Sequence, residues 1–150
     1  MTTKSAIDDF ISQRTFAIVG VSRSGKKFGN NTFRELTSHG YKLYPIHPEA
    51  ENLEGVPAYK DFASLPEKVD GVIVIVPPTQ TEKVVRDAAA AGIKRIWMQQ
   101  GAQSDSAIRF CRENGITEIH GECINMFAHD TATFHKFHRT LLKVFGRLPK

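Results

Sequence analysis

Apolar blocks alternate with amphipathic stretches along this chain, a pattern typical of a parallel sheet with helices between its strands. The apolar blocks predict buried strands at 15–20, 41–46, 71–76, 95–99 and 116–120. The stretches that repeat apolar side chains every three or four residues predict helices at 30–39, 79–92 and 104–114. With a short edge strand at 58–59, we expect an α/β fold: a Rossmann-like doubly wound, mainly parallel sheet in the order 3-2-1-4-5-6, with helices on both faces.

Two further helices are expected to flank the core of this sheet, which covers residues 15–127 of a single domain, 1–150. The first spans 5–13 and is amphipathic, with Ser5 as its predicted cap. The second spans 130–147 and bears a basic stripe, formed by Lys136, Arg139, Lys143 and Arg147. We interpret the stripe as a solvated helix face, with contact to nucleic acid or to a protein partner as the alternative.

The loop after the first strand has the composition of a phosphate-binding loop. The strand ends in Gly20, and small and basic residues then lead to Gly29, where the next helix begins. A junction of this kind directs backbone N–H groups and a helix N-terminus toward an anion. Positive charge is added by Arg23, Lys26 and Lys27. The alternative is a purely structural turn, because any parallel sheet needs such a glycine-rich connection.

The loop departs from the dinucleotide fingerprint in two respects. Its glycines do not follow the G-x-G-x-x-G spacing, because Gly20 is followed by Val21 and Ser22. The next strand ends in His47 and Pro48 rather than in the carboxylate that holds the ribose of NAD. We therefore expect a ligand that carries more phosphate charge than NAD.

Composition narrows the class of protein. The chain has 150 residues, a net charge of +4 and 41% hydrophobic residues, which is ordinary for one globular domain. Cys111 and Cys123 show no disulfide-framework spacing, and no apolar run is long enough to span a bilayer. We expect a cytoplasmic protein without membrane association, without a metal site and without a nucleic-acid role.

Several short segments, in a fixed order along the chain, identify a family. They are VGVS at 19–22, KFGN at 27–30, HGYKLYPIHP at 39–48, VIVIVPP at 72–78, IWMQQG at 96–101 and GEC at 121–123. Together they resemble the small stand-alone CoA-binding domain proteins, whose fold is also that of the CoA-binding domain in the succinyl-CoA synthetase α subunit. The match runs from about residue 16 to residue 126.

The resemblance implies that the chain binds coenzyme A or an acyl-CoA. The phosphates are expected at Gly20, Ser22, Arg23, Lys26 and Lys27. Adenosine is expected near His47 and Pro48, where the family pattern has asparagine in place of the histidine. The pantetheine arm is expected to cross Val76, Pro77 and Gly101. The remaining residues expected to contact the cofactor are Val21, Phe28, Gly29, Pro78, Gln99 and Cys123.

The resemblance favours a binding or sensor module over an enzyme. In the synthetases a phosphorylated histidine lies in a second domain, and this chain ends before such a domain, so we expect no ligase activity from it alone. One alternative is an enzyme that depends on NAD(P) or another adenine nucleotide. Another is a redox sensor in which Cys123 forms a mixed disulfide with the CoA thiol. A protein partner or a homo-oligomer stays open.

Overall fold

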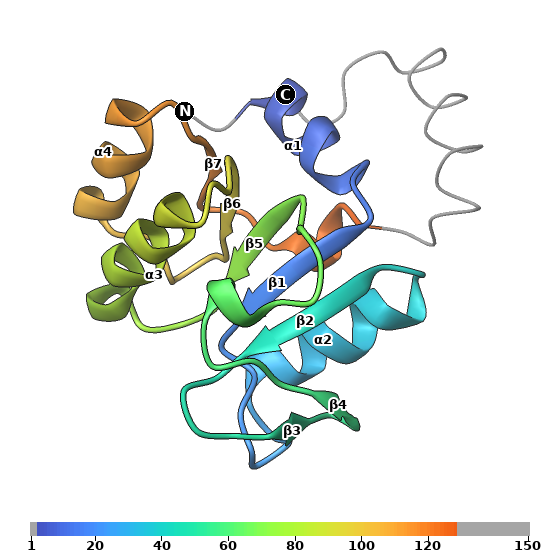
Figure 1. Cartoon of the computed structure of the whole chain (residues 1–150). Helices are drawn as coiled ribbons and strands as arrows, with labels where there is room; N and C mark the ends of the chain where they lie inside the picture. Colours follow the sequence, from blue (N-terminus) through green and yellow to red (C-terminus); the bar gives the residue numbers. More distant parts are fainter. Residues whose placement is uncertain (1–2, 129–150) are drawn as a thin grey trace, which may run out of the picture.

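The architecture is an α/β sandwich with a parallel sheet at its centre, seen in a computed structural model that describes residues 3–128 (Figure 1). The sheet has five strands in the order β2-β1-β5-β6-β7, and every neighbouring pair is parallel. The strands are β1 (Thr15–Val19), β2 (Lys42–Ile46), β5 (Gly71–Val74), β6 (Arg95–Met98) and β7 (Thr117–Ile119). The expected Rossmann-like class with a mainly parallel sheet is confirmed.

Helices cover both faces of this sheet, as expected (Figure 1). One face packs against α1 (Lys4–Ile11), α2 (Phe28–Ser38) and the 3-10 turn η2 (Ile124–Met126). The other packs against α3 (Pro78–Ala90), α4 (Asp105–Glu113) and the 3-10 turn η1 (Phe62–Ser64). A small hairpin, β3 (Asn52–Leu53) with β4 (Val56–Pro57), lies beyond the edge strand β2. No described helix has the length and apolarity needed to cross a membrane.

The two cores are separated by the alternation of side chains along β1. Phe16 and Ile18 point into the α1 face, where the ring of Phe16 stacks on Phe10 of α1 with 4.6 Å between centroids. Ala17 points into the opposite face and packs among residues of α3, α4 and β5. Because the strand is buried on both faces, its apolar run in the sequence is continuous.

The expected strand order differs from the structure in one detail. The segment predicted as an edge strand at 58–59 forms a single parallel bridge, between Tyr59 and Ile46. Tyr59 donates its N–H to Pro45 and accepts one from His47, and the chain then turns away into η1. The preceding residues pair with each other in the β3–β4 hairpin, so they are not available to extend the sheet.

Helices α1, α2 and α3 begin at other residues than the sequence predicted, and α2 begins at Phe28 rather than at residue 30. Thr3 rather than Ser5 caps α1, because its Oγ1 accepts the N–H of Ala6 at 3.1 Å. Helix α3 begins at Pro78, not at Thr79, since proline suits the first helical position, where an N–H has no intrahelical acceptor. The helix expected at 130–147, with its basic stripe, lies outside the described residues.

Helix α2 approaches the end of β1 more closely than any side chain would allow. A Cβ on Gly29 would lie less than 3.0 Å from the carbonyl oxygen of Gly20. A Cβ on Gly20, which has φ +128°, would likewise lie less than 3.0 Å from the carbonyl oxygen of Ile75. These two glycines therefore set the distance between the first turn of α2 and the carboxyl edge of the sheet.

The Gly29→Ala variant tests this close approach. Alanine should cost about 2–3 kcal/mol of unfolding free energy, because the obstructing atom is backbone and cannot rotate away. The matched control is Gly25→Ala in the same loop, where nothing lies within 4 Å and only the positive φ of 74° opposes alanine. Thermal unfolding should show the larger fall for Gly29→Ala, and equal falls would contradict the close approach.

Tyr41 supplies a second test, at the opposite edge of the sheet. Its hydroxyl donates to the carbonyl of Ile11 at 2.7 Å, and burial raises the pKa of the phenol from 10.0 to about 12. Below pH 10 the phenol is protonated in both states. Between about pH 10 and 12 the unfolded chain loses the proton first, so the folded state loses stability there by about 1.4 kcal/mol per pH unit.

We therefore expect Tyr41→Phe to cost about 1 kcal/mol at neutral pH and progressively less above pH 10, because only the wild-type protein carries the phenol. Urea unfolding of both proteins at pH 7 and pH 11 measures the difference. A difference that stays the same at both pH values would contradict this account of Tyr41.

Candidate functional site

A pocket of about 600 Å³ opens at the carboxyl ends of β1, β2, β5 and β6. This is where ligands bind in open parallel sheets, at the point where the strand order reverses. The expected site residues that line it are Gly20, Val21, Ser22, Lys27, Phe28, Gly29, His47, Pro48, Val76, Pro77, Gln99 and Gly101. The structure thus brings together four segments that are far apart in the sequence.

Four of the expected residues do not line this pocket, namely Arg23, Lys26, Pro78 and Cys123. Gln100, which adjoins the expected Gln99 and Gly101 after β6, also lines the pocket, and five lining residues were not predicted, namely Val19, Ile46, Ile75, Gln80 and Ala102. Val19, Ile46 and Ile75 form part of the pocket wall because the residue at the end of a strand borders the pocket together with the loop that follows it. Gln80 enters because α3 begins earlier than its sequence suggests, so its first turn borders the pocket.

The loop between β1 and α2 is held by hydrogen bonds of its own. Ser22 Oγ accepts the N–H of Ser24, and Ser24 Oγ accepts the N–H of Lys26 at 3.1 Å. The loop then enters α2, whose first residues, Phe28 and Gly29, line the pocket. The first N–H groups of a helix lack intrahelical acceptors, so this turn can donate hydrogen bonds to an anion.

The cations of this loop differ in where they lie. Lys27 lines the pocket. Arg23 pairs instead with Glu49, which follows β2, at 3.2 Å between Nη2 and Oε1. Both side chains of this pair are well exposed, at 63% and 70%. Glu49 therefore compensates part of the charge that Arg23 can offer to a ligand.

His47, which stands where the family pattern has asparagine, makes the hydrogen bonds that an asparagine side chain would make in this turn. Its Nδ1 accepts the backbone N–H groups of Glu49 and Ala50 at 3.1 and 3.0 Å. An asparagine side-chain oxygen makes the same kind of turn. Because Nδ1 is an acceptor, the proton of the neutral ring resides on Nε2, which leaves this nitrogen as a donor.

Gln99 connects the pocket to the segment after β7. Its side chain is buried, its Oε1 accepts the N–H of Ile124 at 2.9 Å, and its Nε2 donates to Cys123 Sγ at 3.2 Å. Cys123 is thus held by Gln99 and does not reach the pocket wall. The other thiol, Cys111, belongs to the core as expected, and burial raises its pKa to about 12.

No cluster of three or more histidine, cysteine, aspartate or glutamate side chains that could hold a metal occurs within residues 3–128. His120, a conceivable ligand from its spacing to Cys123, instead lies with its Nδ1 2.6 Å from Glu118 Oε1. The pocket therefore offers N–H groups, one lysine and an apolar wall. This combination suits an anionic ligand with an uncharged extension.

Comparison with known proteins agrees with this description. The chain is 32% identical over 91 residues to the α subunit of acetate–CoA ligase (ADP-forming) II from Pyrococcus furiosus, which is 60% of this chain and 20% of that protein. It therefore spans about a fifth of that relative's length. It is 23% identical over 125 residues to the uncharacterized protein YneT from Bacillus subtilis, covering 83% of this chain and 93% of YneT.

Solved structures include relatives of similar size. A conserved hypothetical protein from Pyrococcus furiosus superposes with a TM-score of 0.71 and 34% identity, over 75% of this chain and 97% of that one. A hypothetical protein from Pyrococcus horikoshii shares the fold with a TM-score of 0.75 at 24% identity, over 89% and 91% of the two chains. The family model described as "CoA binding domain" matches residues 14–129, which include every strand that the structure describes and all residues lining the pocket. The chain belongs to the CoA binding domain family.

Proposed function

We propose that this chain binds coenzyme A or an acyl-CoA in the pocket at the carboxyl edge of the sheet, as a module without chemistry of its own. The observation that carries the proposal is that one pocket joins Lys27 and the first turn of α2 to an apolar wall. CoA has the same division, because its phosphates are clustered at the nucleotide end and its pantetheine arm is narrow and uncharged.

In this proposal the phosphates lie against the first turn of α2, within reach of Lys27 and Ser22. The adenosine lies beside His47 and Pro48, where the Nε2–H of the histidine can donate to it. The pantetheine arm runs along Ile75 and its neighbours toward Gly101. All these residues line the pocket, and the neighbours of Ile75 that complete the path are Val76 and Pro77.

The pocket gives less support to the alternatives. An NAD-dependent enzyme needs a carboxylate near the ribose, and the carboxylate after β2, Glu49, does not line the pocket and pairs with Arg23. A mixed disulfide with CoA needs the thiol of Cys123 at the pocket wall. Cys123 does not line the pocket, and its Sγ accepts a hydrogen bond from Gln99, which does. Of the described lining residues, only Lys27 and His47 carry a group suited to proton transfer, and Nδ1 of His47 is already engaged.

Isothermal titration calorimetry with CoA, NAD and NADP tests the proposal directly. We expect CoA to bind with a dissociation constant at least about tenfold below that of NAD, because the additional phosphate meets the loop and α2. Higher ionic strength should weaken CoA binding, since the attraction is between charges. NAD binding as tight as CoA, or no binding of CoA at millimolar concentration, would contradict it.

Glu49→Gln tests the part played by the Arg23–Glu49 pair. Because Glu49 compensates part of the charge of Arg23, removing the carboxylate charge should tighten CoA binding by about two- to fivefold, within the range of an exposed ion pair. Lys27→Gln should weaken binding. The matched control is Glu51→Gln, which makes the same charge change at an exposed neighbouring residue.

The gain from Glu49→Gln should disappear when Arg23→Gln is also present. The same gain in the Glu51→Gln control would show that only net charge matters. That result would remove Arg23 from the proposed contacts while leaving the pocket itself in place.

A further inference from the structure

A buried amide lies directly behind the loop proposed to hold phosphate. Asn30, in the first turn of α2, is 0% exposed and uses the full hydrogen-bonding capacity of its side chain. Its Oδ1 accepts the backbone N–H of Ser22 at 3.1 Å and that of Lys27 at 3.3 Å. Its Nδ2 donates to the carbonyl of Ser22 and to Glu54 Oε2, both at 2.8 Å. One side chain therefore fastens both ends of the loop.

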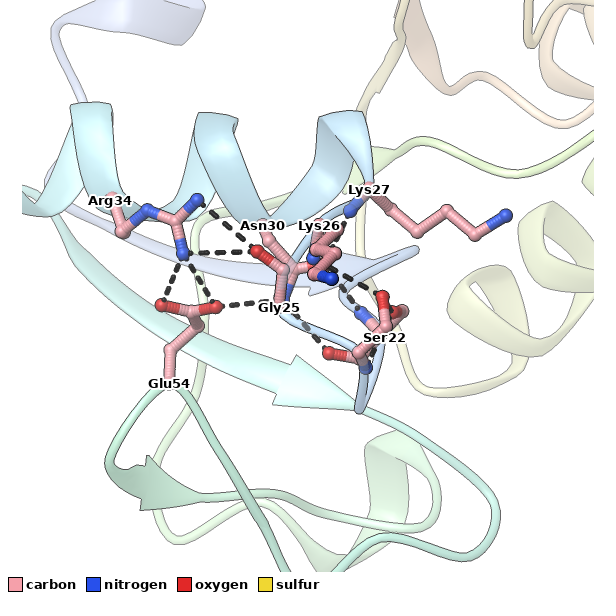
Figure 2. Close-up of polar contacts among 8 residues, drawn as sticks. Ser22, Gly25, Lys26, Lys27, Asn30, Arg34 and Glu54 are labelled. Carbon is pink, nitrogen blue, oxygen red and sulfur yellow. Dashed lines mark hydrogen bonds and ion pairs between the residues drawn. The ribbon is translucent and has the colours of Figure 1, made fainter.

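The second member of the network comes from another part of the chain. Glu54 occupies the turn of the β3–β4 hairpin, and its carboxylate points at α2 (Figure 2). The side chain is only 12% exposed. Glu54 also has a positive φ of 52°, which is uncommon for a residue other than glycine, and Gly55 follows with φ 80°. Consecutive positive φ values are typical of a tight two-residue hairpin turn, which here delivers a carboxylate to Asn30.

The third member of the network, Arg34, balances the negative charge of Glu54. Arg34 lies one turn after Asn30 on α2, and its Nη1 is 2.9 Å from each oxygen of Glu54 (Figure 2). The same guanidinium donates to the carbonyl of Gly25, in the middle of the loop, at 3.4 Å. Arg34 thus compensates a carboxylate that would otherwise repel a phosphate bound nearby.

We infer that Asn30, Glu54 and Arg34 form a positioning network that holds residues 22–27 in the conformation that receives a phosphate group. The inference rests on the proposed function and assigns the β3–β4 hairpin a part in it. These three residues do not line the pocket, so they act on the ligand only through the backbone of the loop. Lys27 takes part in both the network and the pocket. Its backbone N–H donates to Asn30, whereas its side chain extends away from the network (Figure 2).

The chemistry of Asn30 explains why a close isostere should fail. Aspartate in its place would lose both donated hydrogen bonds. The new carboxylate would instead face two acceptors, the carboxylate of Glu54 and the carbonyl of Ser22, and would be repelled by both. Glu54→Gln in the same protein would remove one of the two charges and supply an amide that can donate to the new aspartate. The pair of substitutions reverses the direction of one hydrogen bond instead of deleting it.

Two measurements on Asn30→Asp separate the network from the ligand. Backbone amide exchange in the unliganded protein should accelerate at least about tenfold at Ser22 and Lys27, because repulsion from Glu54 and from the Ser22 carbonyl moves the acceptor oxygen away from these two N–H groups. The dissociation constant for CoA should rise about tenfold or more, whereas that for pantetheine, which lacks phosphate, should change less than about twofold. Adding Glu54→Gln should recover part of the loss.

Arg34→Gln provides a second variant in which folding is not in question, because the side chain is 53% exposed. It should weaken CoA binding several-fold, and Glu54→Gln should restore it, since the uncompensated charge is then gone. Arg86→Gln is the control for charge, because Arg86 forms an exposed pair with Glu82 elsewhere on the molecule. Tyr41→Phe is the control for stability, because it removes a buried hydrogen bond at the other edge of the sheet.

The outcomes are distinct. Unchanged exchange at Ser22 and Lys27 in Asn30→Asp would overturn the network whatever the ligand is. Accelerated exchange with unchanged CoA affinity would overturn its role in binding, as would equal losses in Tyr41→Phe. If the wild-type protein binds no CoA, the proposed function fails. Accelerated exchange in Asn30→Asp would then still show that the network holds the loop in place.

Discussion

The contact between Gly29 and Gly20 determines where everything else at the carboxyl edge of the sheet can lie. Because neither residue has a Cβ, the first turn of α2 rests against the carbonyl at the end of β1, and that residue in turn rests against Ile75 after β5. The helix N-terminus is thereby brought to the strand ends, and the pocket wall closes around it. Any side chain at either glycine would move the helix, and with it the proposed phosphate contacts.

This close approach leaves the loop between the two glycines to be supported from elsewhere. Within this loop, residues 22–27 are serines, a glycine and basic residues with no apolar side chain to bury, so their conformation depends on hydrogen bonds. The buried side chain of Asn30 supplies them from within α2, and Glu54 orients that amide from the β3–β4 hairpin. The hairpin adds no strand to the central sheet, but its Glu54 contacts Asn30 and Arg34 of α2, which bond to the loop.

The sequence predicted what depends on local pattern. The five sheet strands, the helices between them and most of the pocket wall follow from apolar periodicity and from the rule that loops after parallel strands form the site. What it missed depends on partners distant in the chain. Nothing near Asn30 indicates that Glu54 faces it, and Arg23, predicted as a phosphate ligand, is paired with Glu49. Tyr59 failed to extend the sheet because the residues before it pair with one another.

The central claim is that CoA occupies this pocket with its phosphates at the first turn of α2. It is tested most directly by backbone amide chemical shifts of the protein, recorded with and without saturating CoA. The account predicts the largest changes at residues 20–29, with further changes at His47, at 75–76 and at 99–101, and little change around Tyr41 at the opposite edge. Shifts confined to other surfaces, or none at saturation, would contradict it.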